Sequence, residues 1–315
     1  MTRDSRLVML LLFVLAGCGG GASADDAGAA REDASLPPGT DVGTLEPDAD
    51  SRPDAFIPSA DQATLTYGPE RLEPGDEQTV CIVLDAGNEA ARFVRTIRTS
   101  LPQGSHHMIL YRTTEGVRER PQACIPFASS GDAMFIAETR EAELHFPADT
   151  GLAFDAHQHV RLEVHAVNYV GMPIDVSASA TFEFYPLDVP PTDEVHLLFT
   201  GDMSLYLPPH EETTVTSFHR PDPGARIFAI TSHTHSLGTY ASIEDARSSS
   251  DTEGTLLHES RSWAEPPLDT FDPPIVIPGD RGLRLTCTYR NDGDDYVGFG
   301  LDFEDEMCFL WAYWY

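Results

Sequence analysis

The sequence predicts an all-β fold, with antiparallel sandwiches or jelly rolls behind a disordered N-terminal tether. Short runs rich in Val, Ile, Thr, Phe and Tyr recur along the body of the chain, bounded by Gly, Pro, Asn or Asp. No long segment repeats its apolar residues with a helical period. Many short strands separated by such turn signals are typical of sandwiches and jelly rolls.

Residues 1–18 have the pattern of an export signal. Arg3 and Arg6 precede the apolar run Leu7–Leu15, which is too short to span a bilayer as a permanent helix. The following Ala-Gly-Cys resembles a bacterial lipoprotein cleavage box, which would leave Cys18 as the lipidated first residue. The alternative is an ordinary signal peptide that places Cys18 near the cut by chance. We therefore expect an exported protein of the bacterial cell envelope that meets the membrane only through a lipid anchor.

Residues 19–62 are expected to form a disordered acidic linker. They are rich in Gly, Ala, Pro and Asp and contain few large apolar side chains. Such a segment buries too little surface to offset the conformational entropy lost on folding. A flexible spacer of this kind would separate the anchor from the folded body.

The charge of the chain excludes several classes of partner. Its 51 acidic and 20 basic residues give a net charge of −31, which argues against binding to nucleic acid or to an anionic membrane. Every basic residue is Arg, so chemistry that depends on lysine is excluded as well.

The body divides best at Tyr185–Pro191, which lacks a strand pattern and contains three prolines. We expect an N-terminal domain over 63–186 and a C-terminal domain over 190–315. The expected strands are Gln78–Leu84, His107–Tyr111, Val160–Val167, Ala178–Phe184, Val195–Phe199, Ile227–Ser232, Gly282–Tyr289 and Val297–Phe303.

Four cysteines remain in the body once Cys18 is set aside. An even number in an oxidising compartment suggests two disulfides, for which three pairings are possible. The cysteines separate into an early and a late pair, which favours Cys81–Cys124 and Cys287–Cys308.

His233 and His235 follow a predicted strand and lie two residues apart. Side chains at this spacing project to the same side of a strand, close enough to share one metal ion. His106 and His107 are adjacent, so both can reach one ion only where a strand bulges or begins. His165 alternates with apolar residues in its strand.

Each of these histidines taken alone is better explained as a core or surface residue, and His157 and His159 form a competing same-face pair. Together with the thioether of Met307, however, the imidazoles form a set that favours copper over harder ions. Zinc or iron at the pair of His233 and His235, as in a cupin-like protein, is disfavoured by the thioether.

Four motifs in the order His-His-Met, Leu-x-Val-His, His-Thr-His-x-Leu-Gly and Glu-Met-Cys resemble those of the copper type II, ascorbate-dependent monooxygenases. This family includes the peptidylglycine α-hydroxylating and dopamine β-monooxygenases. The resemblance spans the folded body and implies two consecutive jelly-roll-like β-sandwich domains. Each domain would carry one copper and face the other across a solvent-filled cleft.

The resemblance also implies the ligands, of which those of the second copper are the catalytic residues. The electron-transfer copper would be held by His106, His107 and His165. The oxygen-binding copper would be held by His233, His235 and Met307. Ascorbate would be the reductant, and O₂ would hydroxylate an sp³ C–H bond of a small-molecule substrate.

Three positions depart from the peptide-hydroxylating members, which carry Arg, Asn and Tyr where this chain has Thr231, Phe309 and Trp311. These three residues are candidate substrate contacts, and they favour an apolar or aromatic substrate over a peptide. The sequence thus predicts an exported dicopper monooxygenase. The alternative is a non-catalytic copper-binding lipoprotein on the same scaffold.

Overall fold

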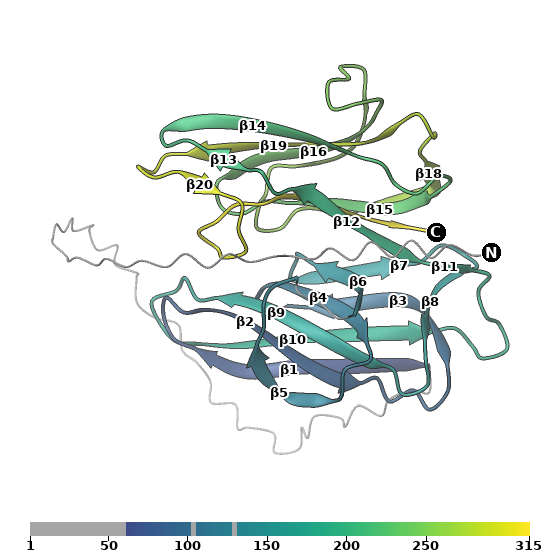
Figure 1. The fold of residues 1–315 in the computed structure, drawn as a ribbon. Coiled ribbons are helices and arrows are strands. Elements are labelled where there is room, and N and C mark those ends of the chain that lie inside the picture. The colour runs from purple at the N-terminus through teal and green to yellow at the C-terminus, as the bar shows by residue number, and fades with distance from the viewer. Residues whose placement is uncertain (1–60, 102–104, 128–130) are drawn as a thin grey trace, which may run out of the picture. The chain divides into compact units, whose positions relative to one another are not determined.

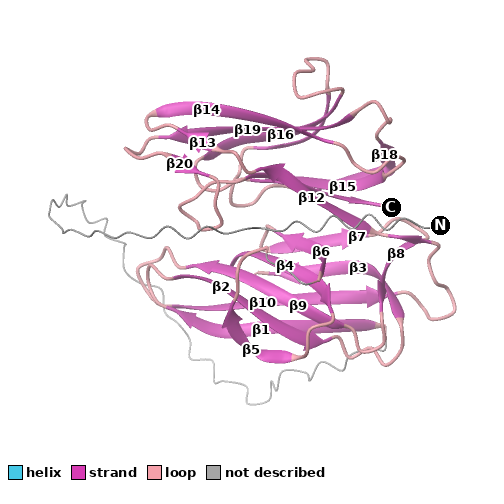
Figure 2. Cartoon of the chain, viewed as in Figure 1, coloured by secondary structure: helices cyan, strands magenta, loops and turns pink. Residues whose placement is uncertain are grey.

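The computed structural model describes residues 61–101, 105–127 and 131–315, within a compact unit that spans residues 56–315. All regular secondary structure in this described part is β, which confirms the all-β part of the predicted fold class (Figure 2). The arrangement into two jelly-roll-like sandwiches stays a prediction. No helix long and apolar enough to cross a membrane occurs in the described part of the chain. The signal segment 1–18, with Cys18, and the linker up to residue 60 lie outside it.

Two sheets are built from the first part of the body (Figure 1). The six-stranded sheet contains β1 (Gln62–Leu72), β10 (Ile174–Phe184), β3 (Arg92–Ser100), β8 (Thr150–Phe154) and β11 (Asp193–Glu194) in that order, with β7 (Glu141–His145) also pairing with β3. The five-stranded sheet has the order β5 (Arg118–Ala123), β2 (Glu77–Asp85), β9 (His159–Val167), β4 (Ser105–Thr113) and β6 (Asp132–Ala137).

Three further sheets are built from the second part of the body. One four-stranded sheet has the order β12 (His196–Asp202), β21 (Cys308–Trp314), β15 (Arg226–His233) and β18 (Asp269–Val276). The other has the order β14 (Glu211–His219), β19 (Gly282–Asn291), β16 (Gly238–Ala246) and β17 (Thr255–Ser260). The remaining two-stranded sheet joins β13 (Tyr206–Leu207) to β20 (Val297–Gly298).

The segment between β10 and β12 separates these two groups of sheets, with one exception. The short strand β11 follows the proline-rich stretch but pairs in parallel with β8 of the first group. At the other end, β1 begins at Gln62, the last residue assigned to the linker. The division into domains 63–186 and 190–315 stays a prediction.

The sheet that contains β15 and β21 is covered on both faces, and this sets the position of the candidate ligands. Leu310 and Ala312 of β21 pack in a core made only of residues from the second part of the body. Phe309, Trp311 and Tyr313 alternate with them and pack in the larger core that includes the first part. Met307 belongs to this second face. A strand buried on both faces reads as a continuous apolar run, which explains why β21 shows no polar alternation.

One expected strand is largely absent. Only Val297–Gly298 of the predicted strand Val297–Phe303 forms a strand, and a turn follows in which the Asp305 amide donates to the Asp302 carbonyl (3.1 Å). A Cβ atom at Gly300 would lie 1.8 Å from the Asp305 carboxylate oxygen, so this close approach requires glycine. The turn returns the chain towards β20 and presents Glu306 and Met307.

Both disulfides expected from the sequence are present in the structure. Cys81 pairs with Cys124, and Cys287 pairs with Cys308. The second disulfide joins β19 to the residue that directly follows Met307.

Candidate metal centre

Strands β4 and β9 place two of the predicted ligands directly opposite each other. His107 pairs with His165 across the sheet, and their ring centroids are 4.9 Å apart. The register of β4 shifts between Ser105 and His107. Because a bulge changes the side to which successive residues point, it is the feature that adjacent histidines need in order to share an ion. His106 lies in β4 at this shift, and its side chain is outside the described part.

The end of β15 brings the second pair of histidines to the same place. The His233 and His235 rings are 5.1 Å apart, and the His233 ring lies 5.9 Å from that of His107. The four rings of His165, His107, His233 and His235 therefore form one continuous row. Each residue in the row is at most 3 % exposed. The solvent-filled cleft implied by the resemblance does not separate these rings, because their side chains pack against one another.

Hydrogen bonds fix a different ring nitrogen for metal binding in the two sets. The Nδ1–H of His233 donates to the Glu138 carboxylate (2.9 Å), and that of His235 donates to the Asp305 carbonyl (2.8 Å). This tautomer places the lone pair of each ring on Nε2. In His165, Nε2 bonds to the Glu77 carboxylate (2.7 Å), which places the lone pair on Nδ1. Carboxylates and carbonyls that orient imidazoles in this way are typical of metal-binding histidines.

Burial keeps the His165 and His235 imidazoles in the neutral form that binds metal. It lowers the pKa of His165, against the opposing effect of the Glu77 hydrogen bond. Burial, followed by the nearby His233, lowers the pKa of His235 to about 3. A neutral imidazole offers its lone pair without first releasing a proton.

Met307 is tied to the histidine segment through the backbone. His233 pairs with Phe309 across β15 and β21, and His235 and Met307 each lie two residues beyond this last pair. Met307 is 1 % exposed, and its carbonyl accepts a hydrogen bond from the Tyr289 hydroxyl (2.6 Å). Two oriented imidazoles and a buried thioether from the adjoining segment are a set of donors that fits a copper ion.

The Glu306 carboxylate links the two ligand segments. It is fully buried and accepts backbone N–H bonds from His235 (2.9 Å), Leu237 (2.6 Å) and Met307 (3.3 Å). Burial raises the pKa of Glu306 to about 7, against the lowering effect of these three donors. Glu306 is thus a positioning residue for His235 and Met307.

Replacing Glu306 by Gln should weaken both the fold and copper binding. One carboxamide oxygen replaces two carboxylate oxygens, which leaves a buried N–H facing an NH₂ group, at a cost of about 1–3 kcal/mol. Loss of such an outer partner lowers metal affinity roughly 10–100-fold. Chemical denaturation and copper titration measure the two effects. Glu304→Gln, at an exposed neighbouring carboxylate, is the control, and equal behaviour of the two variants would contradict the assignment.

The three candidate substrate contacts are all buried. Thr231 donates to the Pro267 carbonyl (2.7 Å), so its hydroxyl holds the β15 segment. The Trp311 ring lies 5.5 Å from that of His233, whereas Phe309 stacks on Phe199 at 5.0 Å. Trp311 and Phe309 thus form an apolar wall beside the histidine row.

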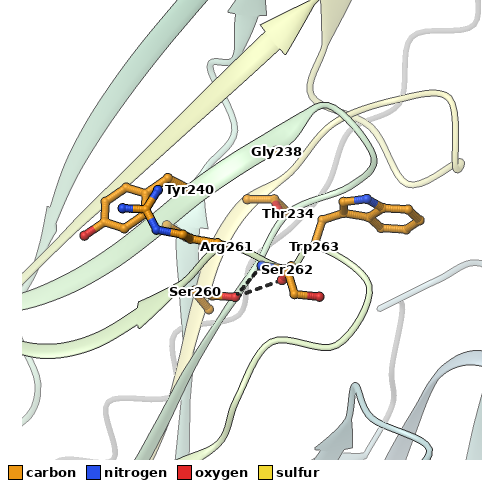
Figure 3. A pocket seen from close by; sticks show the side chains of 9 residues that line it. Thr234, Gly238, Tyr240, Ser260, Arg261, Ser262 and Trp263 are labelled. Carbon is orange, nitrogen blue, oxygen red and sulfur yellow. Dashed lines mark hydrogen bonds between the residues drawn. The ribbon is translucent and has the colours of Figure 1, made fainter.

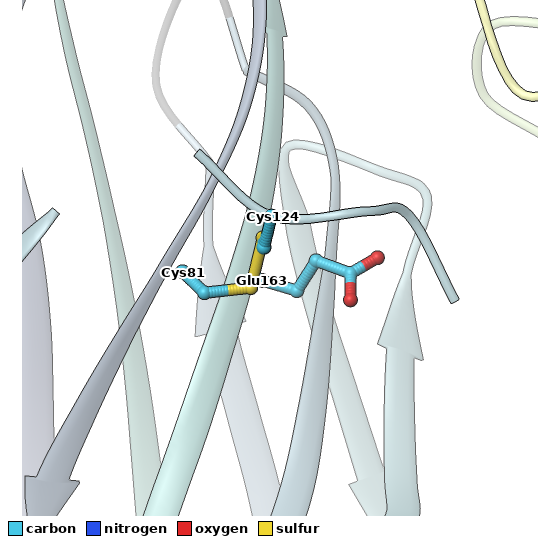
Figure 4. A group of neighbouring side chains, drawn as sticks. All are labelled: Cys81, Cys124 and Glu163. Atoms are coloured by element: carbon cyan, nitrogen blue, oxygen red, sulfur yellow. A yellow bond between two sulfur atoms is a disulfide. The ribbon is translucent and has the colours of Figure 1, made fainter. Parts of the chain in front are cut away.

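The competing pair is not brought into the row. The His157 side chain is 63 % exposed and faces Asp85, while Nδ1 of His159 bonds to the Glu115 carbonyl (2.6 Å). Another cluster with metal-binding residue types, Cys81, Cys124 and Glu163, also fails as a site (Figure 4). Its two sulfur atoms are bonded to each other, so they offer no thiolate.

Glu77, Glu138 and Glu306 could not be identified as positioning residues from the sequence. Glu77 and Glu138 lie far along the chain from the histidines that they orient, and only pairing of the sheets brings them together. For Glu306, the sequence gave one indication of such a role, namely its position directly before Met307.

A comparison with models of known protein families gives a match in the second part of the body. Residues 206–315 match the model of the copper type II ascorbate-dependent monooxygenase, C-terminal domain. The match contains His233, His235 and Met307, and it confirms the resemblance over about a third of the chain. The matched family is one of oxidoreductases that use copper and ascorbate.

Other comparisons are much weaker. No curated protein gives a significant match. The major capsid protein P2 from bacteriophage PM2 is 10 % identical, with coverage of 80 % of this chain and 97 % of that chain and a TM-score of 0.36. N-glycanase F is 8 % identical, with coverage of 80 % and 95 % and a TM-score of 0.34. Likenesses this weak say nothing about the function of this chain.

Proposed function

We propose that this protein is a dicopper monooxygenase that hydroxylates an sp³ C–H bond of a small organic substrate with O₂ and an ascorbate-type reductant. The observation that carries the proposal is the continuous buried row of four histidines. Its last member, His235, is joined to Met307 through the Glu306 carboxylate, in a segment matched to this family. The first copper would be held by His106, His107 and His165, and the second by His233, His235 and Met307.

Copper, when bound, would supply one-electron redox chemistry and an affinity for O₂. The protein contributes orientation, because Glu77 and Glu138 fix the imidazole tautomers of His165 and His233. The His107 and His233 rings are in contact, so no solvent gap separates the residues that would hold the two copper ions. Burial of the row excludes bulk water from reactive species.

The apolar wall supports an apolar or aromatic substrate. Trp311 and Phe309 replace the polar groups that would hold a peptide, and both are at most 6 % exposed. Two jelly-roll-like domains over 63–186 and 190–315 are part of the proposal, supported by the two groups of sheets. Export and a lipid anchor at Cys18 are also proposed, on the sequence pattern of residues 1–18.

Oxygen consumption tests the proposal. Copper-loaded protein should consume O₂ only when both ascorbate and a substrate are present, across a panel of amines, phenols and peptides, and the hydroxylated product should be detectable by mass spectrometry. Peptides ending in glycine should be poor substrates. Copper binding without any substrate-dependent O₂ uptake would contradict catalysis and favour a non-catalytic copper-binding lipoprotein.

A further inference from the structure

The carboxylate of Glu77 joins the first set of histidines to the turn that precedes Met307. One of its oxygens, Oε1, lies 2.7 Å from His165 Nε2 and also accepts a hydrogen bond from the Phe303 backbone N–H at 3.0 Å. A carboxylate oxygen has two lone pairs, so it can accept both hydrogen bonds at once. Glu77 lies on β2 of the first group of sheets, whereas Phe303 belongs to the second part of the body. The shared oxygen therefore connects the two parts.

The turn that donates to Glu77 carries groups that position the second set. The Asp305 N–H donates to the Asp302 carbonyl (3.1 Å), which closes the turn around Phe303. The Asp305 carbonyl accepts the hydrogen bond from His235 Nδ1 (2.8 Å), and Met307 lies two residues further along the chain. A displacement of this turn would therefore move both a hydrogen-bond partner of His235 and the backbone that carries the thioether.

The ring of Phe303 is also held by residues from both parts of the body. It lies 4.8 Å from the ring of Tyr169, which is two residues beyond the end of β9. It lies 5.7 Å from the ring of Trp263, in a loop closed by hydrogen bonds between Ser260 and Ser262 (Figure 3). Contacts of its backbone and of its ring thus fix Phe303 against the first group of sheets.

A second carboxylate also crosses between the two parts. Glu138 directly follows β6 of the first group, and its Oε2 accepts the hydrogen bond from Nδ1 of His233. Both residues are buried. This carboxylate orients a ligand of the second set, whereas Glu77 reaches the first set directly and the second set through the turn.

We propose that Glu77 is a positioning residue for both ligand sets and couples them, so that copper bound at one set strengthens binding at the other. This inference rests on the two copper sites of the proposed function. A metal bound at Nδ1 of His165 withdraws electron density from the ring, so Nε2–H becomes a stronger donor and fixes the Glu77 carboxylate. The fixed carboxylate holds the Phe303 N–H, and the turn has then already lost part of its conformational freedom before the second set binds its ion. Coupling between two binding sites is reciprocal, so the same factor applies in both directions.

Titration of single-set variants with copper(I) tests whether Glu77 acts on both sets. His107→Ala leaves only the second set intact and His233→Ala only the first, and each protein is titrated without oxygen against a competing chelator. Adding Glu77→Ala should weaken copper binding roughly 10-fold or more in both backgrounds. The Glu77 side chain is 31 % exposed, so the fold should tolerate its removal, which circular dichroism checks.

Three further variants separate this role from a general loss of structure. Glu77→Gln keeps one oxygen that can accept both hydrogen bonds, so it should restore most of the lost affinity. Glu138→Ala should weaken binding only in the His107→Ala background. Glu304→Ala removes an exposed carboxylate next to Phe303 and should change neither affinity.

Hydrogen exchange of the Phe303 amide tests the transmission itself. In the His233→Ala protein, filling the first set with diamagnetic copper(I) should slow this exchange, as followed by NMR. Glu77→Ala should remove the effect, and Glu77→Gln should retain it.

The proposal would be overturned if Glu77→Ala leaves the affinity of the second set unchanged, or if Phe303 exchange does not respond to copper(I) at the first set. A Glu77→Gln protein as weak as Glu77→Ala would also overturn it, because the shared oxygen is retained. These results differ from failure of the two-copper proposal, in which His107→Ala or His233→Ala protein would bind no copper at all.

Discussion

Met307→Ile should abolish substrate-dependent O₂ uptake while leaving the protein folded. Isoleucine has a similar volume, so a buried swap of this kind costs less than about 1.5 kcal/mol. The hydrogen bond from Tyr289 to the residue 307 carbonyl involves only the backbone and should remain. The thioether, however, is lost from the ligand set of His233 and His235. We expect activity to fall by on the order of 100-fold or more, with copper content falling by at most one ion per chain.

Met134→Ile is the matched control for this experiment. Met134 is also buried, at 2 % exposure, and lies on β6. Both variants lose a buried sulfur atom, but only Met307 follows the carboxylate that holds His235. Oxygen uptake and thermal unfolding should be measured on both. Full activity of Met307→Ile would show that the sulfur of Met307 is not a ligand needed for turnover.

Removing the disulfide Cys287–Cys308 should cause a large loss of stability. The bridged residues are separated by 21 positions, and both are fully buried. The chain-entropy model gives about 3 kcal/mol for a closed loop of this length. Cys287→Ala with Cys308→Ala should therefore lower the free energy of unfolding by about that amount, as measured by urea denaturation.

The same double variant should also lose copper from the site that contains Met307. Cys308 holds the N-terminal end of β21 against β19, and Met307 directly precedes it. Release of this end frees the backbone that positions the thioether. A loss of stability below about 1 kcal/mol, with unchanged copper affinity, would show that the core alone holds Met307 in place.

The all-β class could be predicted from the sequence because it depends on local residue patterns. Both disulfides could be predicted because only four cysteines in the body had to be paired. The strand β21 was not predicted. Both of its faces are buried, which removes the alternation of apolar and polar residues on which strand prediction depends. The predicted strand at β20 also ran too far, through Phe303, because the turn that brings Gly300 close to the Asp305 side chain depends on contacts that strand propensities do not encode.

For the candidate site, spacing alone indicated that His233 and His235 face one side, and it indicated the need for a bulge at His107. The contact between His107 and His233 could not be predicted, because it depends on how two sheets far apart in sequence pack together. The burial of Trp311 beside His233 depends on the same packing.

Copper stoichiometry of the purified full chain tests the central proposal most directly. After loading and removal of excess metal, elemental analysis should give two copper ions per chain, and His107→Ala and His233→Ala should each retain one. Circular dichroism should confirm that both variants remain folded. A single copper ion per chain that is unaffected by His107→Ala would contradict the assignment of two copper sites to the histidine row.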